Sequence, residues 1–115
     1  MSDPRLVVGE IDVGEGAPRF SGATVYVRLE DVGRADAPAK VIAETVIRNA
    51  GSGAPLAFVL RGVRPPDTSS CSVRVHIDVD GDEAVGVGDL ITMQSYPAAL
   101  ERVPERMRVV VRPVT

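Results

Sequence analysis

Apolar and polar residues alternate in short blocks along this chain, and glycine, proline, aspartate and serine separate the blocks. The clearest block covers residues 24–30, where aliphatic side chains take turns with polar ones: Val25, Val27 and Leu29 against Tyr26, Arg28 and Glu30. Successive residues of a β-strand point to opposite faces, so this pattern predicts a strand with one buried and one solvated face. The same reasoning predicts further strands over residues 7–13, 41–47, 56–60, 72–79, 90–93 and 106–112.

Residues 41–48 form the one segment where a helix competes with a strand. Ala43 and Glu44 tolerate a helix, but the β-branched residues around them lose side-chain freedom in one. We therefore predict a strand there as well, which gives about seven in all. A flat seven-stranded sheet would leave one apolar face in water. We therefore expect an all-β fold, an antiparallel β-sandwich of about seven strands in two packed sheets.

Length and charge limit the possibilities further. The chain has 115 residues, 44% of them hydrophobic and 25% charged, which predicts a single folded domain over residues 1–115. The net charge of -3 includes no excess of positive charge, so we expect no nucleic-acid partner. No apolar run reaches the roughly 18 residues that cross a bilayer, so we expect no membrane span.

The cysteine content and the first residues bear on location. Cys71 is the only cysteine, which excludes an intrachain disulfide and fits a reducing compartment. The first residues show no basic segment followed by an apolar stretch, so no signal peptide is visible. We expect a cytoplasmic protein by default, and a periplasmic or outer-membrane-associated one if a signal peptide was removed.

Four short stretches resemble a known family: VYVRLED at residues 25–31, ADAP at 35–38, KVIA at 40–43 and PLAFVL at 55–60. Over residues 7–97 the chain is similar to small bacterial lipoproteins of the YbaY type, which are grouped with the type III secretion pilotin YscW. The resemblance implies a compact β-sandwich without enzymatic activity. Pilotins of this group act at the outer membrane, where they help a secretin subunit reach its site and assemble. The family's lipid-carrying cysteine has no counterpart, because Cys71 lies deep in the chain, so we expect no lipid anchor.

Few residues are candidates for catalysis. Cys71 and His76 are five positions apart, and an odd separation on one strand places their side chains on opposite faces, which argues against a catalytic pair. The glycines form no phosphate-binding pattern. Arg106, Arg108 and Arg112 share one face of the last predicted strand, and we interpret them as the solvated face of an edge strand.

The stretch 78–89 is rich in carboxylates. Asp78, Asp80, Asp82 and Asp89 occupy positions 1, 3, 5 and 12 of a 12-residue window, which is the ligand spacing of an EF-hand-type calcium loop. The match is partial, because Glu83 stands at the sixth position, where such loops have glycine. The alternative is a solvent-exposed hairpin whose acids keep the protein soluble. These four aspartates are the candidate metal ligands, and no other cofactor is expected.

The sequence therefore predicts a non-enzymatic binding or assembly protein of the YbaY and YscW type, with a protein or peptide as its partner. Two alternatives stay open. One is a calcium-dependent binding or structural module that uses residues 78–89. The other is a small enzyme, for which the sequence supplies no cluster of acid, base and nucleophile.

Overall fold

The computed structural model describes residues 4–14, 16–33, 38–65 and 70–115, and these ranges contain seven strands. The strands are β1 (Arg5–Val13), β2 (Ala23–Asp31), β3 (Lys40–Ala50), β4 (Leu56–Arg61), β5 (Cys71–Asp78), β6 (Leu90–Thr92) and β7 (Glu105–Pro113). No helix forms within the described ranges, and segment 41–48 is extended as part of β3. Residues 35–37 of the ADAP stretch lie outside the described residues.

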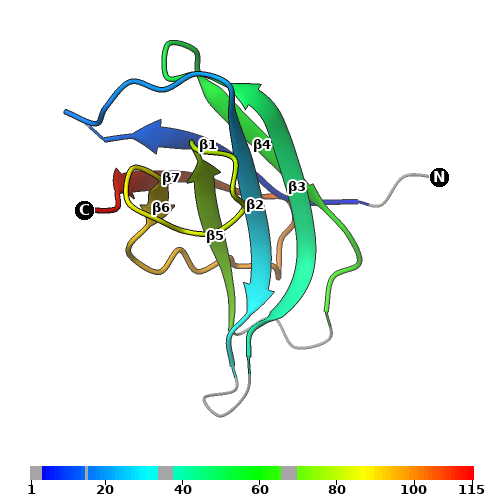
Figure 1. Cartoon of the computed structure of the whole chain (residues 1–115). Helices are drawn as coiled ribbons and strands as arrows, with labels where there is room; N and C mark the ends of the chain where they lie inside the picture. The colour runs from blue at the N-terminus through cyan, green and yellow to red at the C-terminus, as the bar shows by residue number, and fades with distance from the viewer. Residues whose placement is uncertain (1–3, 15, 34–37, 66–69) are drawn as a thin grey trace.

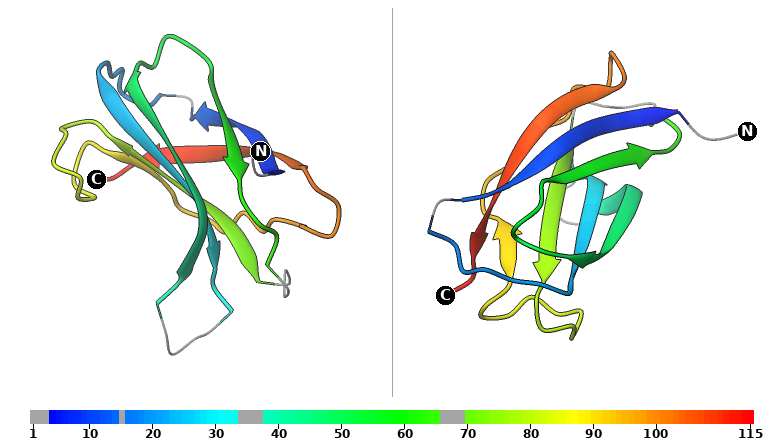
Figure 2. Two further views of the ribbon diagram at one scale, coloured as in Figure 1. Left: turned by 90° about the vertical axis from the view of Figure 1, so that its right-hand side faces the viewer. Right: turned by 90° about the horizontal axis from the view of Figure 1, so that it is seen from above.

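The strands form a single sheet in the order β3-β2-β5-β6-β7-β1-β4. Neighbouring strands run antiparallel, except that the first and the last strand, β1 and β7, pair in parallel. The sheet curls around its apolar face until its two edge strands, β3 and β4, contact each other (Figure 1 and Figure 2). The result is a nearly closed barrel.

The predicted all-β fold with seven strands is confirmed, and the structure corrects two details. The structure has one curled sheet with a parallel pair, where we expected two stacked antiparallel sheets. Curling a single sheet buries its apolar face just as effectively as packing a second sheet against it. In addition, β7 lies between β6 and β1. Arg106, Arg108 and Arg112 are exposed, as expected of a solvated face, but their strand is not an edge strand, so that part of the interpretation is wrong.

The inward rows of the strands meet in one hydrophobic core. Val27 on β2 and Val75 on β5 are directly opposite each other and fully buried. The largest fully buried side chains come from six strands, all but β3, and from one loop: Leu6, Leu29, Leu60, Ile77, Leu90, Leu100, Val7, Val25, Val27, Val73, Val75 and Val109. The parity predicted for β5 is confirmed, because Cys71 is buried in this core and His76 lies on the outer face.

Gly9 in β1 marks a point where the core leaves no room for a side chain. An added Cβ atom would lie 2.6 Å from the ring of Phe58 and 2.6 Å from the carbonyl oxygen of Met107. Phe58 belongs to β4 and Met107 to β7, and both are the direct register partners of Gly9. The glycine therefore lets the Phe58 ring pack directly against the backbone of β1, which lies between β4 and β7.

We expect Gly9→Ala to lower the free energy of unfolding by about 1–3 kcal/mol, because the new methyl group overlaps Phe58 and the sheet backbone. Denaturant titration measures the loss. Adding Phe58→Leu to Gly9→Ala should recover part of it, since the ring is removed and the Met107 carbonyl stays. The matched control is Gly53→Ala, because an added Cβ there meets nothing within 4 Å. Equal losses at Gly9 and Gly53 would show that the close contact has no energetic weight.

Candidate functional site

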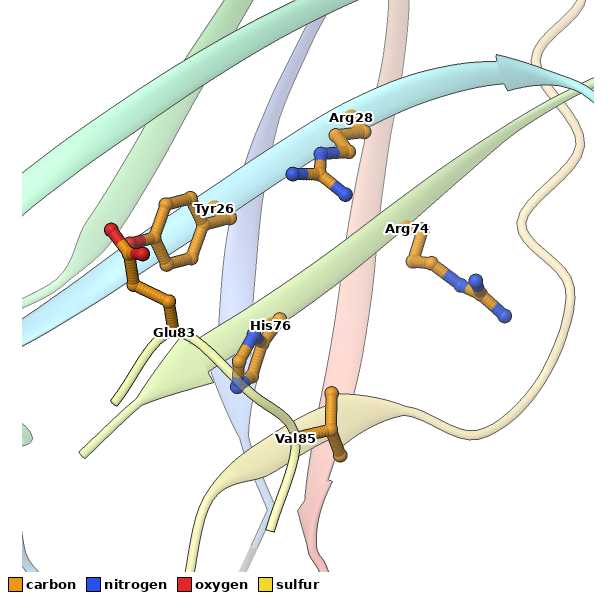
Figure 3. Close-up of a pocket in the computed structure, with 6 residues that line it drawn as sticks. All are labelled: Tyr26, Arg28, Arg74, His76, Glu83 and Val85. Carbon is orange, nitrogen blue, oxygen red and sulfur yellow. The ribbon is translucent and has the colours of Figure 1, made fainter. Parts of the chain in front are cut away.

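The outer face of β2 and β5 carries a hollow of about 450 Å³, which we call the arginine hollow (Figure 3). Two side chains come from β2, two from β5 and two from the loop that follows β5: Tyr26, Arg28, Arg74, His76, Glu83 and Val85. Each strand contributes alternate residues, because only every second side chain points outward. The loop passes in front of β5 and forms one wall (Figure 3).

The register of β2 and β5 places like residues opposite each other in this hollow. Tyr26 pairs with His76, and Arg28 pairs with Arg74. The rings of Tyr26 and His76 are stacked, with their centroids 5.8 Å apart and their planes inclined by 25°. Directly opposed side chains have Cβ atoms about 4.5–5.5 Å apart, so the two guanidinium groups start from neighbouring points.

The two arginines differ in their partners. Arg28 donates from its Nε atom to Glu44 on β3, and 45% of the Arg28 side chain remains exposed. Arg74 makes no hydrogen bond or ion pair with any described residue, although it is exposed beside Arg28. A like charge directly across a strand pair is destabilising. The hollow therefore holds one cation with a carboxylate partner and one without.

A second hollow of about 330 Å³ continues on the other side of Arg74, and we call it the methionine hollow. Among its lining residues are Glu30, Val32 and Met93. It exists because β6 is short and pairs with only His76 and Ile77 of β5. Beyond β6 the chain bends outward and returns to β5 at Tyr96, whose carbonyl accepts from the Val73 N–H at 2.9 Å.

The loop between β5 and β6 brings the four predicted metal-ligand candidates together. One oxygen from each of Asp78, Asp80, Asp82 and Asp89 lies within 4.8 Å of the others. Asp80 and Asp82 are exposed, as expected for acids that serve solubility. Asp78 and Asp89 are each only 1% exposed, so that explanation is wrong for them.

The two buried aspartates organise the loop through its backbone. Asp78 accepts hydrogen bonds from the N–H groups of Gly81 at 3.1 Å and Glu83 at 2.9 Å. Asp89 accepts from the N–H groups of Val79 at 3.0 Å and Gly86 at 3.3 Å. Glu83 takes a positive φ of 66°, the strained conformation expected of the sixth position in a calcium-type loop.

Asp89 also connects the loop to the arginine hollow. His76 Nε2 lies 2.9 Å from Asp89 Oδ2, so the imidazole is fixed on one side by the carboxylate and on the other by Tyr26. Burial raises the pKa of Asp89, but the hydrogen bonds from His76, Val79 and Gly86 outweigh burial and place it below the ordinary 3.8. The carboxylate is therefore ionised at neutral pH.

The remaining candidates from the sequence lie elsewhere. Cys71 is in the core, so the structure separates it from His76. Arg106 and Arg112 line other parts of the surface, away from the arginine hollow. Arg108 pairs with Glu10 of β1 at 3.3 Å, and both side chains are well exposed.

The alternating pattern predicts outward positions for Tyr26, Arg28, Arg74 and His76 but does not group them. The available signal was the matching spacing of Tyr26 and Arg28 on one strand and of Arg74 and His76 on another. Only antiparallel pairing in the observed register places them opposite each other.

Comparison with known proteins identifies the family. A family model described as the type III secretion system lipoprotein chaperone YscW matches residues 2–85. The chain belongs to the YscW family. The matched residues include β1 to β5 and with them both arginines of the hollow.

A solved structure extends the likeness beyond the region that matches the YscW family. It is the structure of an alternative pilotin from the type II secretion system of Vibrio cholerae. The two chains share 29% sequence identity with a TM-score of 0.72, over 95% of this chain and 96% of the pilotin. No curated protein matches the sequence. In the part of the chain that the structure describes, no helix is long and apolar enough to cross a membrane.

The hydrogen bonds to Asp89 lead to a pH-dependent prediction. We expect Asp89→Asn to lower the free energy of unfolding at pH 7 by about 2 kcal/mol, because an amide cannot accept from all three donors. The native pKa of Asp89 is lowered, so its contribution is complete above pH 3.8 and is lost as pH falls through the native pKa. Denaturant titrations from pH 7 downward should show the two proteins converging below pH 3.8.

The control for this measurement is Asp80→Asn, since Asp80 is exposed and accepts one local hydrogen bond from Asp82 N–H. It should change stability at pH 7 by no more than about 0.5 kcal/mol. A gap between wild type and Asp89→Asn that stays constant from pH 7 to pH 2.5 would show that ionisation of Asp89 does not stabilise the fold.

Calcium binding by the loop 78–89 stays a prediction. The oxygens of the four aspartates lie close together, and mutual repulsion between their charges would be relieved by a divalent cation. We expect millimolar calcium to raise the melting temperature relative to excess chelator, with an affinity no better than roughly 10⁻⁴ M. Asp80→Ala should abolish the shift. An unchanged melting temperature of the wild type at millimolar calcium would leave the aspartates as purely structural residues.

Proposed function

We propose that this chain binds a secretin subunit in the cell envelope and supports its assembly, acting by binding and not by chemistry. One observation carries the proposal: the likeness to a type II secretion pilotin extends over 95% of this chain and 96% of that one. The family description, a lipoprotein chaperone of a secretion system, supports the same class of activity.

The surface chemistry is in keeping with a binding role. The two hollows lie side by side on the outer face of the sheet and share Arg74. They offer cationic, aromatic and aliphatic side chains, which are typical contacts in protein–protein interfaces. The only thiol, that of Cys71, is buried in the core and is out of reach of a substrate on this face. These features favour a binding module over the alternative of a small enzyme.

The family also bears on location. Its members are described as lipoproteins, which favours a periplasmic or outer-membrane-associated protein over the cytoplasmic default taken from the sequence. A secretin subunit has to reach the outer membrane without aggregating. A folded periplasmic partner that covers an exposed apolar segment of the subunit would prevent its aggregation.

The test is co-expression of the chain with the secretin subunit encoded in the same genome. We expect the two proteins to co-purify before the secretin assembles, and the yield of assembled multimers to rise when the chain is present. The control is a secretin from an unrelated secretion system in the same assay. If the native secretin assembles equally well without the chain and does not co-purify with it, the proposed function is wrong.

A further inference from the structure

The arginine hollow contains cationic groups that are not fully paired. Arg28 uses its Nε atom for Glu44, which leaves its two terminal amino groups without a hydrogen bond to the described residues. Arg74, directly opposite, has no partner among those residues. Figure 3 shows the two guanidinium groups pointing away from each other, as like charges favour, and a rotation of the Arg74 side chain would let a carboxylate placed between them accept from both.

The surroundings of the two arginines limit how much negative charge the hollow can take. Glu44 pairs with Arg28, Glu83 lines the same hollow, and Glu30 lines the methionine hollow beyond Arg74. Three carboxylates around two guanidinium groups would repel a polyanion such as a nucleic acid or a phospholipid surface. Arg28 is already paired with Glu44, so Arg74 is the cation without a carboxylate partner among the described residues, and a single ligand carboxylate would supply that partner.

Apolar side chains extend the hollow on both sides of the arginines. Val85 is 56% exposed at the loop wall of the arginine hollow. Val32 and Met93 are 50% and 56% exposed in the methionine hollow. A small free anion would leave these residues in water, whereas a peptide with apolar residues on both sides of an acidic one would cover them.

We infer that the arginine hollow binds one aspartate or glutamate side chain of the protein partner, with the apolar neighbours of that residue covering Val85 on one side and Val32 and Met93 on the other. Tyr26 and His76 form a rigid aromatic floor beside the two arginines. The inference rests on the proposed function for the identity of the partner as a secretin subunit, and it adds the site and the chemistry of the contact.

The first arm of the test measures binding of the full chain to the native secretin subunit by titration calorimetry or surface-immobilised binding. We expect Arg74→Gln to weaken binding about ten-fold, the effect of one charge-assisted contact. Arg74→Lys should recover part of the affinity, since it keeps the charge without the planar fork. The matched control is Arg106→Gln, an exposed arginine on the outer face of β7. It should bind like the wild type.

The melting temperature shows whether each variant is folded. Arg74→Gln should melt no lower than the wild type, because the substitution removes a like-charge neighbour of Arg28. Equal secretin binding by Arg74→Gln and the wild type would overturn the inference and leave the proposed function intact. A loss in Arg106→Gln with none in Arg74→Gln would overturn it too, since the contact would then lie on the face of β7.

The second arm does not depend on the secretin. The probe is a short acetylated and amidated peptide with one glutamate between two leucines, added to the isotope-labelled chain and followed by NMR. We expect saturable shifts of the Arg28, Arg74 and His76 signals, and none with the same peptide carrying glutamine. If the wild type does not bind the secretin, the proposed function fails and this arm alone decides the inference. Equal shifts with the glutamine peptide, or shifts only at Arg106 and Arg108, would overturn it.

Discussion

An apolar face that runs the whole width of a seven-stranded sheet has to be hidden from water, and no second layer among the described residues covers it. The sheet solves this by curling until β3 and β4 meet, which turns the inward rows into one core. Strong curvature requires the side chains of β4 to lie close to the backbones of β1 and β7, where the three strands are neighbours. Gly9 allows this because it has no side chain, and the Phe58 ring occupies the space. Outward residues of β2 and β5 are thereby left free to form a site.

The site and the acidic loop are parts of one arrangement. His76 stacks on Tyr26 and reaches Asp89, and Asp89 in turn holds the N–H groups of Val79 and Gly86. No buried polar side-chain atom of the described residues is left without a hydrogen bond. The loop that walls the arginine hollow is therefore held in place by two buried carboxylates whose hydrogen bonds are all made within the protein. The hollow is preformed and keeps its shape without a ligand.

Much of the fold could be predicted from the sequence, because strand position and facing follow from a two-residue period that local residues reveal. Val27 and Val75 are buried and Arg28 and Arg74 are exposed, as their alternation indicates. Pairing could not be predicted, since β1 meets β7 across nearly the whole chain and no local pattern encodes that contact. The arginine hollow depends on the register between β2 and β5, so the sequence alone does not predict it. The spacing of the aspartates did predict their convergence, whereas the burial of Asp78 and Asp89 depends on how the loop folds over them.

The parallel pairing of β1 and β7 also sets the order in which the protein is completed. Val7 lies beside Glu105, so the ladder on this side of β1 cannot form until the last strand has been synthesised. Contacts between residues so far apart in sequence make folding slow, because the chain has to close a long loop before the contact is made. Until its final residues appear, one side of β1 has no strand to pair with, so the barrel of a nascent chain stays incomplete even where β2 has already paired with β3 and β5.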